Sequence, residues 1–213
     1  MSNMKKWLLC LCSVLMIGCS DQTAQTEITP SPASETVETL QDYTELKEEN
    51  AFEIIDSSKV DTMLDHGTGV LYFSFPECPW CQRYITYLNT VAEETGVTVK
   101  YYNIRNDKGT EWYQEVAEKI HDKNPDISRY NNDGDYVIYM PLTLFLKDGE
   151  IIGYDDTSCD LDSDEIAVDD YWTQQRQDLL HEKLTAYFTT TKENIDKGNK
   201  EGCAVKVEED GCN

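Results

Sequence analysis

The sequence predicts an α/β fold in which helices flank a central mixed β-sheet. Two observations carry this prediction. Continuous apolar runs at 69–75 and 97–104 are typical of strands buried on both faces. Helical patterns alternate with these runs, and a hairpin signal follows at 140–154. The resulting order, β-α-β-α-β-α-β-β-α, favours two βαβ units followed by a hairpin and a closing helix.

The first half of the domain begins with a short strand at 51–56, AFEIID. Asp56 or Ser57 can cap the helix that follows, and Gly67 with Gly69 ends it. The apolar face of this helix consists of Val60, Met63 and Leu64. A second helix begins at Pro79, because proline suits the first helical turn. Its apolar stripe consists of Tyr84, Ile85, Leu88, Val91 and Ala92, with Gly96 at its end.

The second half contains a third helix, the hairpin and a closing helix. The third helix is expected at 110–121, with Tyr113, Val116, Ala117 and Ile120 on one face. The polar stretch 122–135 predicts a surface loop. In MPLTLFLKDGEIIGY, the Asp148-Gly149 pair predicts the hairpin turn. The acidic segment 157–170 is expected to be irregular. The apolar stripe of the closing helix consists of Trp172, Leu179, Leu180, Leu184, Tyr187 and Phe188.

The N-terminal residues predict a secretory signal. Lys5 and Lys6 precede an apolar run that is too short to span a bilayer. The motif LMIGC resembles the bacterial lipobox, which implies cleavage before Cys19 and diacylglycerol on its thiol. Residues 1–18 are then a lipoprotein signal peptide, and the protein is expected outside the cytoplasmic membrane, anchored to it through lipid only. The alternative is an ordinary signal peptide with an incidental cysteine.

Composition divides the remaining chain into three segments. Residues 19–48 are rich in Ser, Thr, Glu and Pro, and predict a disordered tether. Residues 49–192 form the expected domain, and 193–213 a flexible tail. The formal net charge of −23 argues against nucleic acid as a partner, because nucleic acid is bound through Lys and Arg. It also disfavours docking of the folded surface on anionic lipid.

The motif Cys78-Pro79-Trp80-Cys81 stands where a buried strand meets a helix. A helix N-terminus favours a thiolate through its unpaired N–H groups and its dipole. Cys78 is therefore expected to be the attacking and more exposed thiol. Cys81, one turn later, can resolve a mixed disulfide. Glu77 is expected to oppose the thiolate to some extent.

Two other interpretations of the motif remain open, a static disulfide and structural zinc. Zinc would need a second pair of ligands, and the spacing of Cys203 and Cys212 is not the usual one. No metal site is expected, because the histidines are scattered along the sequence: His66, His121 and His181. Cys203 and Cys212 are expected to form either a structural disulfide or a second redox pair that passes electrons to the first. Cys159 lies among carboxylates, which should raise its pKa.

Residues 51–190 resemble the thioredoxin superfamily. Three motifs in order carry the resemblance: FSFPECPWC after a buried strand, NIRND at the end of the next strand, and MPLTLFLKDGE. The resemblance implies a thioredoxin-like fold and a cis peptide bond between Met140 and Pro141 beside the cysteines. It also implies that the Met140 backbone and Pro141 hold a substrate peptide, while Pro79 and Trp80 shape the rim of the site.

Three positions depart from cytosolic thioredoxins, in which a buried aspartate occupies the place of Tyr72, a tryptophan the place of Glu77 and a glycine the place of Thr157. Together with the lipobox, the chain resembles thioredoxin-like lipoproteins of Gram-positive bacteria, some of which are described as bacteriocin-transport accessory proteins.

The expected function is an extracytoplasmic thiol–disulfide oxidoreductase that acts on protein thiols and disulfides. It needs no cofactor beyond the Cys78–Cys81 redox disulfide, and the direction of electron flow stays open. A membrane or extracellular electron partner is expected. The alternatives are a non-catalytic accessory or peptide-binding lipoprotein that uses the same groove, and a metal-binding lipoprotein.

Overall fold

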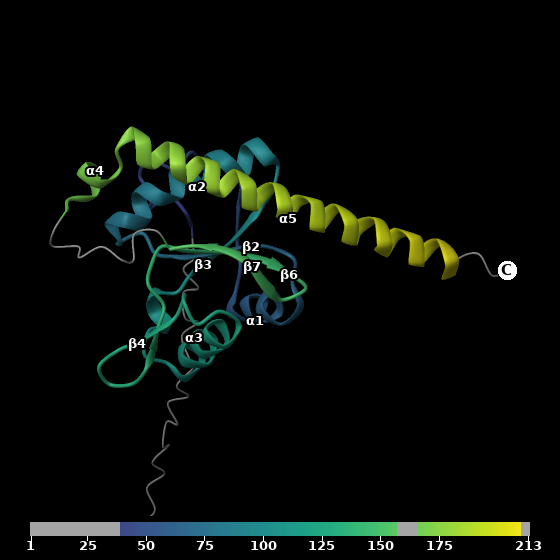
Figure 1. The fold of residues 1–213 in the computed structure, drawn as a ribbon, viewed down its shortest axis with the longest axis horizontal. Coiled ribbons are helices and arrows are strands. Elements are labelled where there is room, and N and C mark those ends of the chain that lie inside the picture. The colour runs from purple at the N-terminus through teal and green to yellow at the C-terminus, as the bar shows by residue number, and fades with distance from the viewer. Residues whose placement is uncertain (1–38, 157–165, 210–213) are drawn as a thin grey trace, which may run out of the picture. The chain divides into compact units, whose positions relative to one another are not determined.

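A five-stranded mixed sheet forms the centre of the fold, with the strand order β1-β3-β2-β6-β7 (Figure 1). The computed structural model describes residues 39–156 and 166–209, and side chains as far as residue 199. The strands are β1 (Phe52–Ile54), β2 (Gly69–Ser74), β3 (Val99–Asn103), β6 (Leu142–Lys147) and β7 (Glu150–Asp155). The first three run parallel, whereas β6 and β7 run antiparallel to their neighbours. The predicted mixed sheet is confirmed.

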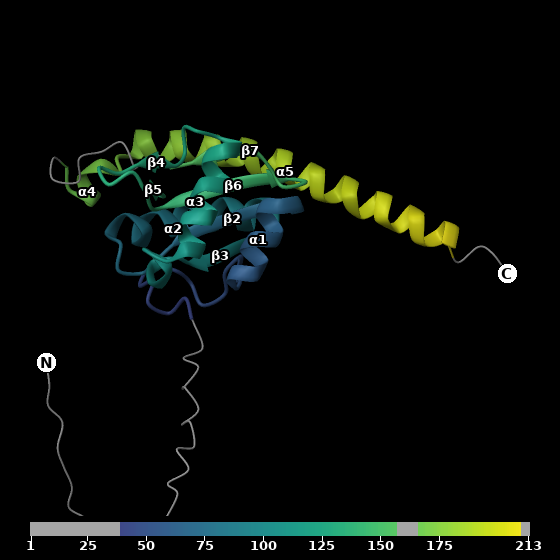
Figure 2. The same cartoon turned by 90° about the horizontal axis from the view of Figure 1, so that it is seen from below.

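Helices cover both faces of this sheet, which confirms the predicted α/β class (Figures 1 and 2). The helices are α1 (Ser57–His66), α2 (Pro79–Thr95), α3 (Glu111–Lys123), α4 (Val168–Tyr171) and α5 (Gln174–Glu209), with a short 3-10 turn, η1, at Arg105–Asp107. The helices α2 and α5 pack on one face, and α1 and α3 on the other. In the part of the chain that the structure describes, no helix is both long and apolar enough to cross a membrane.

The sequence of strand β2 is a nearly unbroken apolar run because both of its faces are covered. Val70 and Tyr72 point into the core shared with α2 and α5, whereas Leu71 and Phe73 point toward α1 and α3. All six residues of β2 are buried. Because side chains alternate between the two faces of a strand, a strand covered on both faces needs an unbroken apolar run. Because β2 is the central strand of the five, residue 74 at its C-terminal end lies midway along one edge of the sheet.

The helix boundaries follow local signals. Asp56 caps α1 by accepting a hydrogen bond from the Lys59 N–H, and Pro79 opens α2. Gly96 ends α2 in the left-handed conformation. At the β6–β7 turn, Gly149 has φ of 80°, and a Cβ there would lie 2.3 Å from the Asp65 carbonyl oxygen. Glycine is thus required at this turn both by conformation and by space.

Two local expectations need correction. The predicted surface loop 122–135 contains the start of a small hairpin, β4 (Arg129–Tyr130) with β5 (Tyr136–Val137). The Asn131 side chain accepts hydrogen bonds from the Asp133 and Asp135 N–H groups, and such side-chain turns have no apolar periodicity to reveal them. Leu179 was expected in the buried stripe of α5 but is 58% exposed. It lies about 100° around the helix from Leu180, which is buried.

Both ends of the domain also differ from expectation. Residues 39–48 were expected in the disordered tether, yet they pack on the fold, because Tyr43 contributes a core side chain that is 1% exposed. Residues 193–209 were expected in a flexible tail but continue α5 to Glu209; among the side chains described, up to residue 199, Thr191 is the last buried one. The expectations for residues 1–38, including Cys19, and for Cys159 and Cys212 lie outside the described residues, as does the side chain of Cys203.

Candidate functional site

The two cysteines of the CPWC motif lie at the N-terminus of α2, directly after the central strand β2. Cys78 is the N-cap of α2, and its Sγ accepts a hydrogen bond from the Cys81 N–H at 3.3 Å. A turn closed by the Cys78 N–H and the Phe75 carbonyl, 3.2 Å apart, brings the chain from the strand into the helix. Both cysteines are free thiols in this structure. The predicted position of the pair at a strand–helix junction is therefore confirmed.

The two thiols differ in exposure and acidity. Cys78 is half-buried, whereas Cys81 is completely buried, so the prediction that Cys78 is the more exposed thiol is confirmed. A hydrogen bond from the Cys81 side chain, assisted by the Cys81 and Trp80 N–H groups and by Lys108, lowers the pKa of Cys78 to about 7, although burial opposes this. Burial raises the pKa of Cys81 well above its ordinary value.

Positive charge beside the pair offsets the acidic Glu77. The Arg105 Nε lies 3.6 Å from the Glu77 carboxylate. Arg105 and Lys108 each lie over the ring of Phe75, at 5.1 Å and 5.2 Å from its centroid. These two cations come from η1 and the residue after it. Of the two, Lys108 helps to lower the pKa of Cys78, whereas Arg105 pairs with Glu77.

Met140 and Pro141 lie at the same end of the sheet as the cysteines. The register of the β2–β6 pair sets Phe73 opposite Leu142, so the residues just before Leu142 face the end of β2. The Met140–Pro141 peptide bond is cis, as the resemblance implied. Met140 and Trp80 are both half-buried and pack, like Cys78, against the core under α2. The structure thus brings the six predicted residues of this site to one end of the sheet: Cys78, Pro79, Trp80, Cys81, Met140 and Pro141.

Aromatic residues from α4 complete the surroundings of Trp80. The Trp80 and Tyr171 rings meet edge to face with centroids 5.2 Å apart, and Tyr171 in turn contacts Trp172 at 4.9 Å. The sequence pattern assigned Trp172 to the apolar stripe of the closing helix, but Trp172 is buried at the C-terminal end of α4, before α5 begins at Gln174. The pattern did not reveal Tyr171. Trp80 and Tyr171 are about 90 residues apart in the sequence, and no periodicity connects residues at such a distance.

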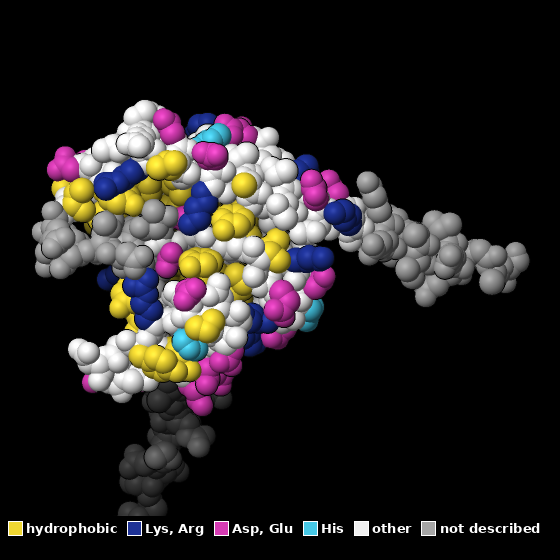
Figure 3. Space-filling view, in the orientation of Figure 1, with side chains coloured by type: hydrophobic (Ala, Val, Ile, Leu, Met, Phe, Trp, Pro, Cys, Tyr) yellow, Lys and Arg dark blue, Asp and Glu magenta, His cyan; other side chains and the backbone are white. Residues whose placement is uncertain are grey.

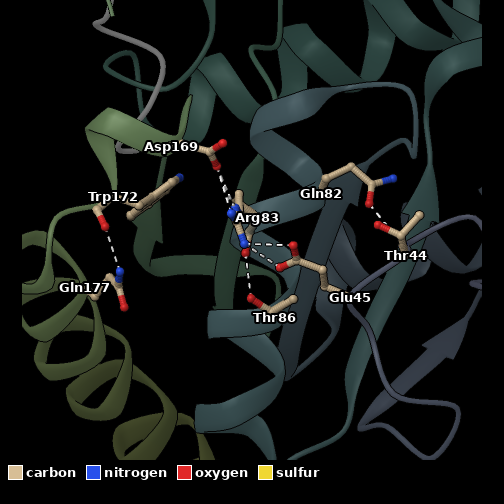
Figure 4. Close-up of polar contacts among 8 residues, drawn as sticks. All are labelled: Thr44, Glu45, Gln82, Arg83, Thr86, Asp169, Trp172 and Gln177. Atoms are coloured by element: carbon tan, nitrogen blue, oxygen red, sulfur yellow. Dashed lines mark hydrogen bonds and ion pairs between the residues drawn. The ribbon is translucent and has the colours of Figure 1, made fainter. Parts of the chain in front are cut away.

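The two residues that follow the motif bind the N-terminal segment and α4 to α2 (Figure 4). Arg83 lies between two carboxylates, with Glu45 Oε2 at 2.6 Å and Asp169 Oδ1 at 2.8 Å. The Thr44 N–H donates to the Gln82 side-chain oxygen at 3.1 Å. A surface pocket of about 430 Å³ lies here, between these segments and the start of α2. No local sequence pattern reveals the role of Arg83, because its partners are distant along the chain.

The described residues contain no group of three or more His, Cys, Asp or Glu side chains suited to a metal ion. The Nδ1 of His121 lies 2.9 Å from the Ser128 carbonyl oxygen, and the Nε2 of His181 lies 2.8 Å from Glu94.

No protein-family model matches the sequence, and no curated protein matches it either. The assignment of a function to this chain therefore depends on the geometry of its own residues.

Proposed function

We propose that this protein is a thiol–disulfide oxidoreductase with a thioredoxin-like fold, acting on protein substrates through Cys78 and Cys81. The observation that carries the proposal is the division between the two thiols. One is half-buried at a helix N-terminus with a pKa of about 7, and the other, one turn later, is buried with a raised pKa. Such a pair suits one sulfur to attack and the other to resolve.

The exchange follows from these properties. The Cys78 thiolate attacks one sulfur of a substrate disulfide, a mixed disulfide forms, and the other substrate sulfur leaves as a thiolate. Cys81 then attacks the Cys78 Sγ, which closes the intramolecular disulfide and releases the reduced substrate. With a pKa near 7, about half of Cys78 is ionised at neutral pH. The reverse sequence, from an oxidised pair, would oxidise a substrate dithiol with the same residues.

Substrate contacts are assigned to the residues around the pair. The Met140 backbone and Pro141 lie at the end of the sheet beside the motif, where an extended peptide could pair with the chain. Trp80 and Pro79 form the rim next to Cys78, and Tyr171 supports Trp80 from α4. This arrangement supports a protein or peptide substrate rather than a small thiol.

The location proposed for this activity is the outer side of the cytoplasmic membrane of a Gram-positive bacterium, with Cys19 as the lipid attachment site and a membrane or extracellular protein as electron partner. The lipobox-like LMIGC motif supports this part of the proposal. Mass spectrometry of the N-terminal peptide after expression in such a bacterium tests it. A diacylglyceryl group on Cys19, absent from the Cys19→Ser variant, is the expected result, and an unmodified Cys19 would contradict it.

Two assays on the purified protein test the activity: dithiothreitol-dependent reduction of insulin and oxidation of a reduced, unfolded protein. We expect turnover in at least one assay, and its loss in Cys78→Ser. The Cys81→Ser variant should accumulate a mixed disulfide with the substrate, detectable by mass spectrometry. The reduction potential then gives the direction, since oxidants and reductants of this kind differ by ~100 mV or more.

Absence of turnover in both assays, with Cys78→Ser behaving like the parent protein, would refute the enzyme. Binding of an unfolded peptide beside Met140, Pro141 and Trp80 would then support the non-catalytic accessory interpretation. Metal retained after purification under reducing conditions would instead support a metal-binding protein.

A further inference from the structure

The short helix α4 is attached to α2 at two places, one inside the CPWC motif and one just after it. The Asp169 Oδ1 accepts hydrogen bonds from the Arg83 Nε at 3.2 Å and from the Arg83 Nη2 at 2.8 Å (Figure 4). Two residues later in α4, the Tyr171 ring meets the Trp80 ring edge to face, with centroids 5.2 Å apart. Residues three apart in a helix lie on the same side of it, so Trp80 and Arg83 present one flank of α2 to α4.

The position of α4 depends on such side-chain contacts. The helix has four residues, which is too short to be stable by itself, and among the described residues no side chain caps its N-terminus. At its C-terminal end Tyr171 and Trp172 are buried. Toward its N-terminal end Val168 packs only partly on the core, and the Asp169 side chain is 79% exposed. Burial therefore fixes the end of α4, and the ion pair with Arg83 adds a directional contact at its start.

Arg83 is itself held from the opposite side by the N-terminal segment. Its Nη1 donates to both carboxylate oxygens of Glu45, at 2.6 Å and 2.8 Å. A planar guanidinium that is fixed on one side presents its remaining N–H groups in a set direction, which here is toward Asp169. We call Arg83, Glu45 and Asp169 the Arg83 cluster. Because these side chains are partly exposed, the ion pairs add little to global stability, and their main effect is on position.

The Arg83 cluster also borders the surface next to the attacking thiol. The pocket of about 430 Å³ at the start of α2 is lined by all three members of the cluster and by both sequence neighbours of Cys78, Glu77 and Pro79. Consecutive Cα atoms are only about 3.8 Å apart, so the residues on either side of a substrate cysteine bound at Cys78 would extend over this rim. The placement of Trp80 and α4 therefore bears on a peptide substrate.

We infer that Arg83 is a positioning residue of the substrate site: it holds α4 against α2, so that Tyr171 keeps the Trp80 ring in place on the rim beside Cys78. The inference rests on the proposed exchange activity and concerns recognition of the peptide chain, not the sulfur chemistry. Arg83 acts through Asp169 and is assigned no contact with either sulfur. Its loss should therefore slow the reaction with a peptide disulfide and spare the reaction with a small disulfide.

The test compares two probes with the same leaving group. One is dithiodipyridine, and the other is an uncharged peptide whose single cysteine carries a thiopyridyl group. The Cys78 thiolate attacks the sulfur of the peptide cysteine, the peptide–thiopyridyl disulfide breaks, and thiopyridone leaves and is measured by its absorbance. The Cys78→Ser variant gives the background from other cysteines. An uncharged peptide is used so that removal of a charge from the protein does not alter long-range attraction.

In Arg83→Met we expect the rate constant with the peptide to fall by about 3- to 5-fold, the size expected from the loss of partly exposed ion pairs, with the dithiodipyridine rate unchanged. Lys119→Met is the matched control. The Lys119 side chain is 34% exposed, close to the 36% of Arg83, and pairs with Asp65 at 2.7 Å, but it joins α3 to α1 on the other face of the sheet. It should change neither rate.

A double-mutant comparison tests whether Arg83 acts through the Trp80 ring. In a Trp80→Leu background, Arg83→Met should have no further effect on the peptide rate, because the ring that it positions is gone. An unchanged peptide rate in Arg83→Met, equal losses with both probes, or the full loss in the Trp80→Leu background would overturn the inference while leaving the exchange activity intact. A parent protein that reacts with both probes no faster than Cys78→Ser would instead refute the proposed function itself.

Discussion

The acidity of Cys78 comes mainly from groups within one helical turn of its sulfur. The Cys81 side chain and N–H and the Trp80 N–H all favour the thiolate, and Lys108 adds a charge from a different segment. The same helix start that exposes Cys78 buries Cys81, because position 81 faces the core. One turn of helix is therefore sufficient to give two identical side chains different chemistry.

At this scale we predict a pH profile for alkylation. The rate of Cys78 modification by iodoacetamide, measured by mass spectrometry in Cys81→Ala and in the parent protein, should follow the thiolate fraction. In the parent protein it should rise with pH through a midpoint near 7. In Cys81→Ala the midpoint should move upward, because the largest influence that lowers the pKa is removed.

Lys108→Gln should also move the alkylation midpoint of Cys78 upward, by less than Cys81→Ala does, because Lys108 is a weaker influence. Lys192→Gln, an exposed lysine on α5, is the control and should leave the midpoint in place. A midpoint near 9, the ordinary thiol value, in the parent protein would contradict the prediction.

At the scale of elements, α5 is held on the sheet by one stripe of side chains. Leu180, Leu184 and Phe188 recur every four residues and are buried, and the Phe188 ring contacts Phe145 of β6 with centroids 5.3 Å apart. On the same helix, Leu179 faces solvent. The packing of α5 against the sheet therefore depends on this stripe of buried side chains. It does not depend on the total number of apolar residues in the helix.

We therefore predict different costs for two leucine truncations on α5. Leu184→Ala should lower the free energy of unfolding by about 2–5 kcal/mol, because it removes a fully buried side chain and leaves a cavity. Leu179→Ala should change it by less than about 0.5 kcal/mol. Urea denaturation followed by circular dichroism measures both, and similar costs for the two variants would show that the stripe is assigned wrongly.

A second prediction at this scale concerns Arg83, which joins α2 to the N-terminal segment and to α4. Arg83→Met keeps the apolar stem but removes both ion pairs, and because these pairs are partly exposed we expect a global cost of only about 1 kcal/mol. The larger effect should be local. Amide hydrogen exchange should accelerate in residues 39–50 and 168–171, and not in β2 or β3.

Lys47→Met is the matched control for Arg83→Met, since Lys47 lies in the same N-terminal segment and pairs with Glu93 at 3.4 Å while 73% exposed. It should leave exchange in both segments unchanged. Uniform acceleration across the sheet in Arg83→Met, or none at all, would show that Arg83 does not hold these segments.

The elements could be predicted from the sequence to the extent that local rules determine them. Caps at Asp56, Pro79 and Gly96 and the apolar periodicities gave the order of the helices and the central strands. The site could be predicted where a motif carries it, at the CPWC pair and at Met140–Pro141. Tyr43 and Arg83 act through contacts across the fold, which no local periodicity reveals.

At the scale of the whole molecule, acidity is the dominant property. The formal net charge is −23, yet acidic and basic side chains are interspersed on the face seen in Figure 3. Self-repulsion of such a net charge destabilises the compact state, and salt screens it. We predict that the melting temperature rises from low salt to physiological ionic strength, as measured by differential scanning calorimetry. A neutral osmolyte at equal osmolality is the control, and a melting temperature that falls with salt would contradict the prediction.

The N-terminal segment also has a mechanical consequence. Residues 39–50 enter the fold through Tyr43, whose Oη hydrogen-bonds to the Ser74 Oγ, and through Thr44 and Glu45, which bind Gln82 and Arg83 just after the CPWC motif. Tension applied to the chain upstream of residue 39 would therefore load these contacts before it reached any strand of the sheet. Pulling strong enough to extract Tyr43 would remove the partner of Ser74 while the strand pairing stayed intact. Force on the N-terminal segment would thus reach the residues just after the CPWC motif before it reached the sheet.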